Sequence, residues 1–235
     1  MMSTPHFRGL VEKGEMESAF RLLETMVENR RDIPNVASCN KLTQGLCRVE
    51  KTSKASRVLE MLEESGEAVL PTVVTYTVMI GGYCNQGNVD KALDLLDRMM
   101  VSPNGVCYNT LLKGFCDSGE LDKALELLDR MKVAPDVVSY TTLLKGLCDS
   151  GKLDRAIELL GRQLKSGCYP DVYTYNTLIG AFCEERGIEK ALEFLDALRR
   201  GSNPNVVTYS ILVYVFNLCL PTGHDHLSHH HSEPM

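Results

Sequence analysis

YNTLLKGFCDSG at residues 108–119 and YTTLLKGLCDSG at residues 140–151 are nearly the same twelve residues, 32 positions apart. Ten of the twelve positions are identical, and the two changes are Asn109 to Thr141 and Phe115 to Leu147. The cysteine of this stretch recurs along the chain with spacings of 37, 32, 32 and 35 residues, at Cys47, Cys84, Cys116, Cys148 and Cys183. A recurrence of this period indicates tandem repeats that stack into a solenoid.

Aligning these cysteines divides the chain into repeats of 32–37 residues. The boundaries are a half repeat at 7–35, repeats at 36–72, 73–104, 105–136, 137–171 and 172–205, and a partial repeat at 206–217. Residues 1–6 are interpreted as a leader. The divergent tail at 218–235 holds five of the six histidines, and we expect it to be disordered rather than to bind a metal.

Each repeat has the pattern of two amphipathic helices joined by a short turn. In the repeat 105–136, the first apolar stripe at helical spacing consists of Tyr108, Leu111, Leu112, Phe115 and Cys116. After a turn at Ser118 and Gly119, the second stripe consists of Leu121, Ala124, Leu125, Leu128 and Met131. Pro135 ends the unit, because proline does not continue a helix. We therefore predict an all-α fold, a right-handed α-solenoid superhelix of tandem helical-hairpin repeats of about 35 residues.

Three residue types recur at fixed places in these hairpins. An alanine that we assign to the close approach of paired helices recurs as Ala55, Ala92, Ala124, Ala156 and Ala191. Asp90, Asp122 and Asp154 fall in the first turn of the second helix, where the helix dipole favours an anion. The repeat cysteines have no CxxC spacing and no histidine nearby, so we predict that they pack in the core and bind no metal.

The composition and charge limit the classes of function. The chain is 44% hydrophobic and 24% charged, which is ordinary for a globular protein, and its formal net charge is −6. No apolar run approaches the roughly 18 residues of a membrane span. A Gly-rich phosphate loop, a metal-ligand spacing and a catalytic constellation are also missing. We therefore predict a protein that is not an enzyme, with no cofactor, no small-molecule substrate and no membrane association.

Several segments resemble a known repeat family. VVTYTVMIGGYCNQGNVDKALDLLDRM, VVSYTTLLKGLCDSGKLDRAIELL and VYTYNTLIGAFCEERGIEKALEFLD are similar to pentatricopeptide repeats (PPR) of the P class, plant type. The resemblance implies binding of single-stranded RNA, one base per repeat. It also implies a mitochondrial or chloroplast protein in organelle RNA stabilisation, processing, splicing or translation, with other RNA-processing proteins as further partners. The first residues, however, have no transit-peptide character, which fits a cytosolic or an N-terminally incomplete chain.

The resemblance assigns base readout to two slots of each repeat, the residue after the tyrosine and the residue after the closing proline. These pairs are Asn40 with Thr72, Thr77 with Asn104, Asn109 with Asp136, Thr141 with Asp171, and Asn176 with Asn205. All ten side chains are small and polar, which core packing or general solvation does not explain. We expect the slot after the tyrosine to lie on the exposed face of the first helix.

Hydrogen-bond chemistry links the closing slot to the base. An Asp side chain only accepts, so it suits the imino N–H of uracil or guanine, whereas Asn also donates and suits adenine or cytosine. By the resemblance, Thr in the other slot prefers purines and Asn prefers pyrimidines, and repeats run 5′ to 3′ with the chain. The predicted core is 5′-AUGY-3′, read by Thr77/Asn104, Asn109/Asp136, Thr141/Asp171 and Asn176/Asn205 in that order. Asn40/Thr72 is expected to prefer a pyrimidine.

Two further sets of residues complete the predicted interface. By the resemblance, the residues that wedge between bases are Val74, Val106, Val138 and Tyr173. The alternative is that the valines pack each hairpin against its neighbour. Candidates for phosphate contact are Lys113, Lys145 and Arg48, and ordinary solvated side chains remain the alternative. The net charge of −6 opposes RNA binding. A protein-binding α-solenoid scaffold, or a weakly binding fragment of a longer repeat protein, is the alternative function.

Overall fold

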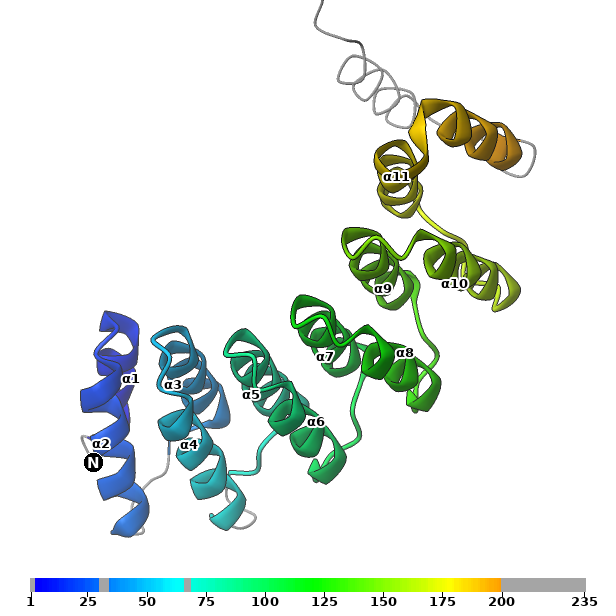
Figure 1. Ribbon diagram of the computed structural model, residues 1–235. Helices are drawn as coiled ribbons and strands as arrows, with labels where there is room; N and C mark the ends of the chain where they lie inside the picture. The colour runs from blue at the N-terminus through cyan, green and yellow to red at the C-terminus, as the bar shows by residue number, and fades with distance from the viewer. Residues whose placement is uncertain (1–2, 30–33, 66–68, 200–235) are drawn as a thin grey trace, which may run out of the picture. The chain divides into compact units, whose positions relative to one another are not determined.

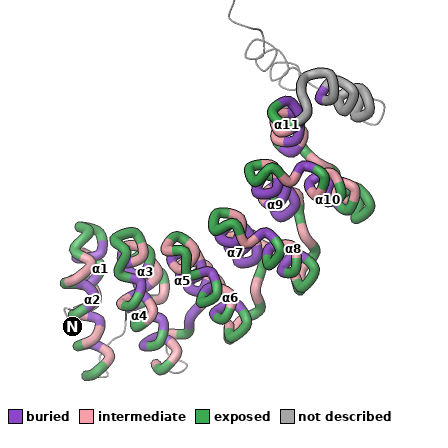
Figure 2. The backbone as a smooth tube through the Cα atoms, in the orientation of Figure 1, coloured by how far each residue is buried: buried purple, intermediate pink, exposed green. Residues whose placement is uncertain are grey.

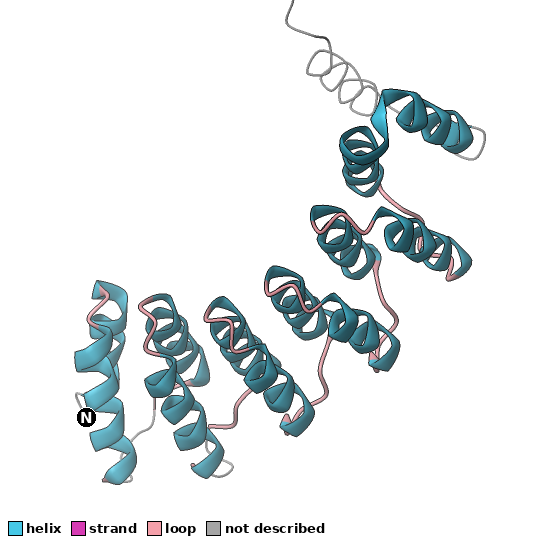
Figure 3. Ribbon diagram, viewed as in Figure 1, coloured by secondary structure: helices cyan, strands magenta, loops and turns pink. Residues whose placement is uncertain are grey.

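The computed structural model describes residues 3–29, 34–65 and 69–199, with the backbone alone for residues 3, 186–190 and 192–199. In these ranges the chain consists of helices and loops, without strands (Figure 3). The helices are α1 (Ser3–Lys13), α2 (Met16–Glu28), α3 (Val36–Arg48), α4 (Thr52–Glu64), α5 (Val73–Asn85), α6 (Val89–Arg98), α7 (Gly105–Asp117), α8 (Leu121–Arg130), α9 (Val137–Asp149), α10 (Leu153–Lys165) and α11 (Val172–Arg199). The chain divides into two compact units, Met1–Pro170 and Asp171–Met235, and each is described by itself.

The first unit is a stack of helical hairpins. The first helices of the hairpins form one row, in which each helix packs against the next: α1, α3, α5, α7 and α9. The second helices form a second layer beside this row (Figure 1). Each of α4, α6 and α8 also packs against the first helix of the following hairpin. The predicted all-α repeat solenoid is confirmed, and the right-handed sense of the superhelix stays a prediction.

The core of this unit lies between the helices of each hairpin and between successive hairpins (Figure 2). The alanines predicted at the close approach of paired helices are fully buried here, as Ala55, Ala92, Ala124 and Ala156. The large side chains of Tyr76, Phe115 and Leu46 are also fully buried. Because every hairpin buries one side against its neighbour, the stack forms one continuous apolar core.

The repeat cysteines pack against glycines of the following hairpin. Cys47 faces Gly82, Cys84 faces Gly114, and Cys116 faces Gly146. A Cβ atom added at Gly114 would lie 2.7 Å from Cys84 Cβ, and one added at Gly146 would lie 2.9 Å from Cys116 Cβ. Only glycine therefore leaves room for the cysteine, and the predicted packing role of these cysteines is confirmed. Burial raises the pKa of the Cys47 and Cys84 thiols to about 11 and that of Cys116 to about 12.

The turn inside each hairpin contains one residue with a positive φ, three positions after the repeat cysteine. Gly87, Gly119 and Gly151 take φ values of 71°, 78° and 65°, and Glu50 takes 59°. Glycine suits this left-handed conformation because it has no Cβ. In the last full repeat the same position is Arg186, and α11 runs through it as a single helix of 28 residues. No loop therefore interrupts Val172–Arg199, although α11 bends sharply along its length (Figure 1). The missing glycine alone does not explain the missing loop, because the chain turns at Glu50 without one.

The N-terminal part also differs from the expected half repeat. Helices α1 and α2 form a complete hairpin, and the expected leader contributes residues 3–6 to α1. The predicted partial repeat at 206–217 and the tail at 218–235 lie outside the described residues.

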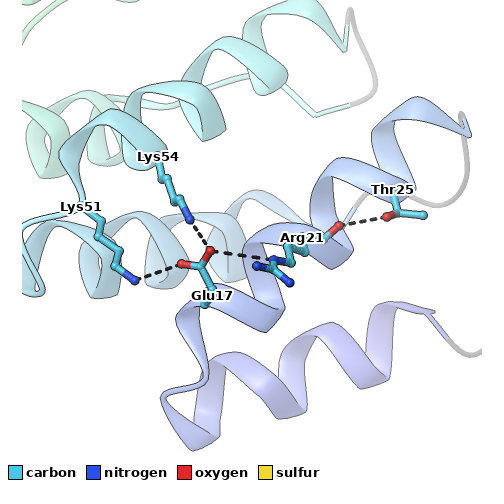
Figure 4. Close-up of polar contacts among 5 residues, drawn as sticks. All are labelled: Glu17, Arg21, Thr25, Lys51 and Lys54. Atoms are coloured by element: carbon cyan, nitrogen blue, oxygen red, sulfur yellow. Dashed lines mark hydrogen bonds and ion pairs between the residues drawn. The ribbon is translucent and has the colours of Figure 1, made fainter.

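Ion pairs connect the second helices of successive hairpins, and we call them the outer ion pairs. Lys123 Nζ lies 2.8 Å from Asp90 Oδ1, and Arg155 Nη2 lies 2.7 Å from Asp122 Oδ1. The other members are Arg130 with Asp97, Arg162 with Asp129, and Lys54 with Glu17. Hydrogen bonds from Lys54 and Lys51 to Glu17 hold the pKa of Glu17 at about 2 (Figure 4). Much of the acidic charge thus lies on the second helices, paired with basic side chains.

Candidate nucleic-acid interface

The closing-slot residues begin helices. Asn104 Oδ1 accepts a hydrogen bond from the Cys107 N–H at 3.1 Å, and Asp136 Oδ1 accepts one from the Ser139 N–H at 2.9 Å. Asp171 Oδ1 caps α11 in the same way, 2.8 Å from the Thr174 nitrogen, and the Thr72 N–H donates to Thr75 Oγ1 at 3.0 Å. N-cap positions favour Asn, Asp, Ser and Thr for this reason. Capping therefore explains why this slot is small and polar, but it does not explain the choice between Asn and Asp.

The slot after the tyrosine lies within the first helix, one turn from its start. Thr77 Oγ1 donates to the Val73 carbonyl at 2.7 Å, and the side chains of Thr77 and Asn109 are partly exposed. Thr141 is buried, with 8% of its surface accessible, so the expectation that it lies exposed is wrong. A threonine is short enough to be covered by its surroundings in this row of close-packed helices.

The structure brings the two slots together in the repeat 105–136. The Asn109 amide nitrogen donates to Asp136 Oδ1 at 3.2 Å, although the two residues are 27 positions apart. The Ser139 hydroxyl lies 2.6 Å from Asn109 Oδ1 and 2.9 Å from Asp136 Oδ1. This cluster joins the first helix of one hairpin to the start of the next. Sequence reasoning predicted Asn109 and Asp136 but missed Ser139.

Asp136 remains charged in this cluster. Partial burial pushes its pKa up, but hydrogen bonds from the Ser139 backbone, the Asn109 amide and the Ser139 hydroxyl together outweigh burial and hold the pKa below the usual value. The Asn109 amide and the Ser139 backbone N–H both donate to Oδ1, and the Ser139 hydroxyl lies 2.9 Å from the same oxygen. Among the described residues, Oδ2 and the second N–H of the Asn109 amide have no hydrogen-bond partner. The site therefore leaves one acceptor and one donor for a ligand.

The preceding pair is arranged differently. Thr77 Oγ1 lies 3.0 Å from Cys107 Sγ, and the Cys107 N–H donates to Asn104 Oδ1. Thr77 and Asn104 thus meet through one shared neighbour, Cys107, which holds the same helix position as Ser139. In the sequence this position can be recognised as the third residue of the first helix, directly before the repeat tyrosine.

The remaining pairs are less connected. The Oδ1 atoms of Asn40 and Asn176 are buried without a hydrogen-bond partner. A buried unpaired oxygen is costly, so a ligand that donates to it would be stabilised. Asn205 lies outside the described residues. Thr141 and Asp171 belong to different units and are described separately.

The predicted wedge residues are exposed. Val74, Val106, Val138 and Tyr173 have 59%, 60%, 57% and 55% of their surface accessible. Side chains that packed the hairpins together would be buried, so the packing alternative is disfavoured. Their role in base stacking stays a prediction.

Positive charge is sparse on this surface. Lys113 lies 3.1 Å from Asp117 on α7, and both side chains are mostly exposed. Lys145 and Arg48 are exposed and make no ion pair within the described ranges. An exposed pair such as Lys113 with Asp117 is weak and screened by salt, so Lys113 can exchange Asp117 for another anion. Phosphate contact stays a prediction for all three.

Residues 3–29, 34–65 and 69–199 offer neither a membrane-spanning helix nor a cluster of metal ligands. No helix there is both long and apolar enough to cross a membrane. No group of three or more His, Cys, Asp or Glu residues is placed to hold a metal ion in that part of the chain.

Known proteins with similar sequences all carry one repeat type. Models described as "PPR repeat family" match residues 135–184 and 170–216, and models described as "PPR repeat" match residues 68–100, 99–132 and 7–30. A pentatricopeptide repeat-containing protein of Arabidopsis thaliana is 36% identical over 87 residues, which is 37% of this chain and 10% of that protein. A second one is 32% identical over 91 residues, 38% of this chain and 12% of that protein. The chain spans about a tenth of the length of these relatives.

Solved structures share the fold. The pentatricopeptide repeat protein PPR10 from maize superposes with a TM-score of 0.66 at 24% identity, covering 86% of this chain and 27% of that one. PPR10 in complex with an 18-nucleotide psaJ RNA element gives 0.62 at 24% identity, with 89% and 35% covered. The PPR domain of Arabidopsis thaliana protein-only RNase P 1, in complex with tRNA, gives 0.57 at 17% identity, with 77% and 98% covered. From its repeat matches and its stacked helical hairpins, this chain belongs to the pentatricopeptide repeat family.

Proposed function

We propose that this chain binds single-stranded RNA and reads one base with each pair of neighbouring hairpins. The observation that carries the proposal is the contact between Asn109 and Asp136. These two residues are distant in sequence, yet their side chains meet at 3.2 Å. They leave one acceptor and one donor without a partner among the described residues, and Val106 and Val138 on the same two helices are exposed.

This pair of groups matches uracil. Asp136 Oδ2 accepts the imino N–H of the base, and the free Asn109 N–H donates to the adjacent carbonyl oxygen. Guanine offers the same donor and acceptor, and the preference of Asn for a pyrimidine and of Thr for a purine is the one that the family resemblance implies. The low pKa of Asp136 supports this role, since a protonated carboxyl group would no longer accept reliably.

The proposed sequence follows the order of the hairpins. The chain reads 5′-AUGY-3′, with A at Thr77/Asn104, U at Asn109/Asp136, G at Thr141/Asp171 and a pyrimidine at Asn176/Asn205. Exposed Val74, Val106, Val138 and Tyr173 separate the bases, and apolar stacking of this kind is tolerant of sequence. The similarity to PPR10 solved with an RNA element supports the proposal.

Within a cell, the proposed role is in organelle RNA metabolism. A bound repeat array blocks nucleases or keeps a transcript from folding, and neither effect needs an active site. Stabilisation, processing, splicing and translation are all consistent with such binding. Other RNA-processing proteins would then be neighbours on the same transcript.

Fluorescence anisotropy tests the proposal directly. The purified chain is titrated with a short fluorescent RNA containing AUGC and with a scrambled RNA of the same composition, at two salt concentrations. We expect tighter binding to AUGC and weaker binding to both RNAs at higher salt. Equal affinity for the two RNAs, or none for either, refutes base reading.

One observation favours a different function, a scaffold that binds proteins. The net charge is −6, and Asp117 lies beside Lys113 on the surface proposed to face phosphate. A scaffold needs no basic surface. Absence of RNA binding in the anisotropy assay would favour this second function.

A further inference from the structure

We propose that Ser139 is a positioning residue for base reading, which makes the third residue of each first helix a determinant of the base read by the hairpin before it. This inference rests on the proposed function and deepens it. It concerns a residue that does not touch the base. Its hydroxyl instead fixes the orientation of the Asn109 side-chain amide.

The geometry around Asn109 favours one amide orientation. Asn109 Oδ1 faces the Ser139 hydroxyl at 2.6 Å, and Nδ2 faces Asp136 Oδ1 at 3.2 Å. If the amide were rotated by half a turn, its oxygen would face the carboxylate and lose the hydroxyl donor. Both neighbours therefore hold an N–H toward Asp136, which leaves the other N–H for the base.

Ser139 also assigns the two oxygens of Asp136 to different tasks. The Ser139 backbone N–H donates to Oδ1 at 2.9 Å, and the Asn109 amide donates to the same oxygen at 3.2 Å. The single hydroxyl hydrogen of Ser139 goes to Asn109 Oδ1, its nearer acceptor at 2.6 Å. Oδ2 then keeps no hydrogen-bond partner among the described residues. A single residue thus sets the donor on Asn109 and the acceptor on Asp136, which together distinguish uracil from cytosine in the proposed reading.

Other hairpins show what happens without a serine there. Cys107 holds this place next to Thr77, and its thiol is a weak donor at 3.0 Å from Thr77 Oγ1. Thr75 holds it in the hairpin after Asn40, but its hydroxyl is bonded to Thr72, and Asn40 Oδ1 is left without a partner. The amide of Asn40 is therefore not held as that of Asn109 is.

The experiment compares Ser139→Ala with Ser139→Thr, which keeps the hydroxyl. Ser38→Ala is the matched control, because Ser38 is the third residue of α3 and its N–H also binds the cap side chain at 2.9 Å. All variants are titrated with RNAs that carry U or C at the second base of AUGC. We expect Ser139→Ala to lose the preference for U by about fivefold, as for one neutral hydrogen bond. Ser139→Thr and Ser38→Ala should keep it, and the preference for A at the first base should persist in all.

A second measurement needs no RNA. The side-chain amide signals of Asn109 are recorded by NMR in the free protein, and Asn109→Thr identifies them by their loss. Ser139→Ala should shift these signals and speed their hydrogen exchange, whereas Ser139→Thr should not. Unchanged amide signals in Ser139→Ala, or an unchanged preference for U, overturn the positioning role. A wild-type chain that does not distinguish U from C refutes the proposed base reading instead, and the amide signals tell the two failures apart.

Discussion

Replacing Gly114 by alanine is expected to destabilise the stack, although alanine is the better helix former. The new Cβ would lie 2.7 Å from Cys84 Cβ, where carbon atoms prefer about 3.5–4.0 Å. Rotation of the Cys84 side chain cannot relieve a contact with its own Cβ, so the helices must separate. Forcing an extra methyl group into a packed core costs about 1–3 kcal/mol. The gain in helix propensity offsets about 0.5–1 kcal/mol of that cost.

Gly161→Ala is the control, because this glycine lies inside α10 with no atom within 4 Å of the added Cβ. It gains the same helix propensity without the clash and should stabilise the protein. The difference between the two variants, about 1–3 kcal/mol, therefore isolates the close contact. Thermal unfolding followed by circular dichroism should place Gly114→Ala several degrees below Gly161→Ala, at about 2–4 °C per kcal/mol.

A second pair of variants tests the same geometry. At Gly82 the added Cβ would lie 3.1 Å from Cys47 Cβ, so most of the clash comes from the sulfur. Cys47→Ala should therefore restore much of the stability that Gly82→Ala loses, whereas Cys84→Ala should restore less of the stability that Gly114→Ala loses. The comparison is made after the stability cost of each cysteine variant alone is subtracted. If Gly114→Ala melts at or above Gly161→Ala, the cysteines do not pack on the glycines as described.

Three further predictions concern other parts of the molecule. Asn109→Thr should move the preference at the second base from U toward G in the anisotropy assay. The melting temperature should fall only by the few degrees expected for the lost hydrogen bond to Asp136, and a larger loss of stability would show that Asn109 is mainly structural. The pKa of Glu17 is lowered to about 2, so its ion pairs stabilise the fold above pH 4.5 and are lost as the pH falls toward 2. Glu17→Gln should therefore flatten the dependence of stability on pH in that interval, as measured by acid unfolding. An unchanged curve would contradict the pairing. The raised pKa values of Cys47, Cys84 and Cys116 leave almost no thiolate at pH 7.5. These thiols should therefore react slowly with a maleimide until the protein is unfolded in urea, as followed by mass spectrometry. Rapid labelling of the native protein would argue against their packing.

Much of the fold follows from the sequence because the repeat supplies the same evidence several times. A single stripe such as Tyr108, Leu111 and Phe115 shows only an amphipathic helix, but its recurrence with an alanine and a cysteine at fixed places shows a stack. The turn was harder to predict. Glu50 and Arg186 both replace the glycine of the turn, yet the chain turns at Glu50 and continues as a helix through Arg186.

The candidate site was predictable only in part. The pairing of Asn109 with Asp136 came from the family resemblance, and the structure brings the two side chains into contact. Ser139 was missed because its role depends on the orientation of an amide, which no sequence pattern reveals. The outer ion pairs were missed because they need helices of different hairpins to lie together, although the recurring Asp-Lys and Asp-Arg dipeptides, such as Asp122-Lys123, were a usable signal.

The contact between cysteine and glycine bears on how such an array lengthens. Gly114 and Cys116 lie two residues apart near the end of α7, one facing the preceding hairpin and the other facing the following one. A duplicated unit of 32 residues therefore carries both halves of the joint, and it fits between any two existing units without compensating substitutions. Gene duplication can then copy a hairpin whole, leaving later point mutations to change its few ligand-facing residues, as the difference between Asn109 and Thr141 illustrates.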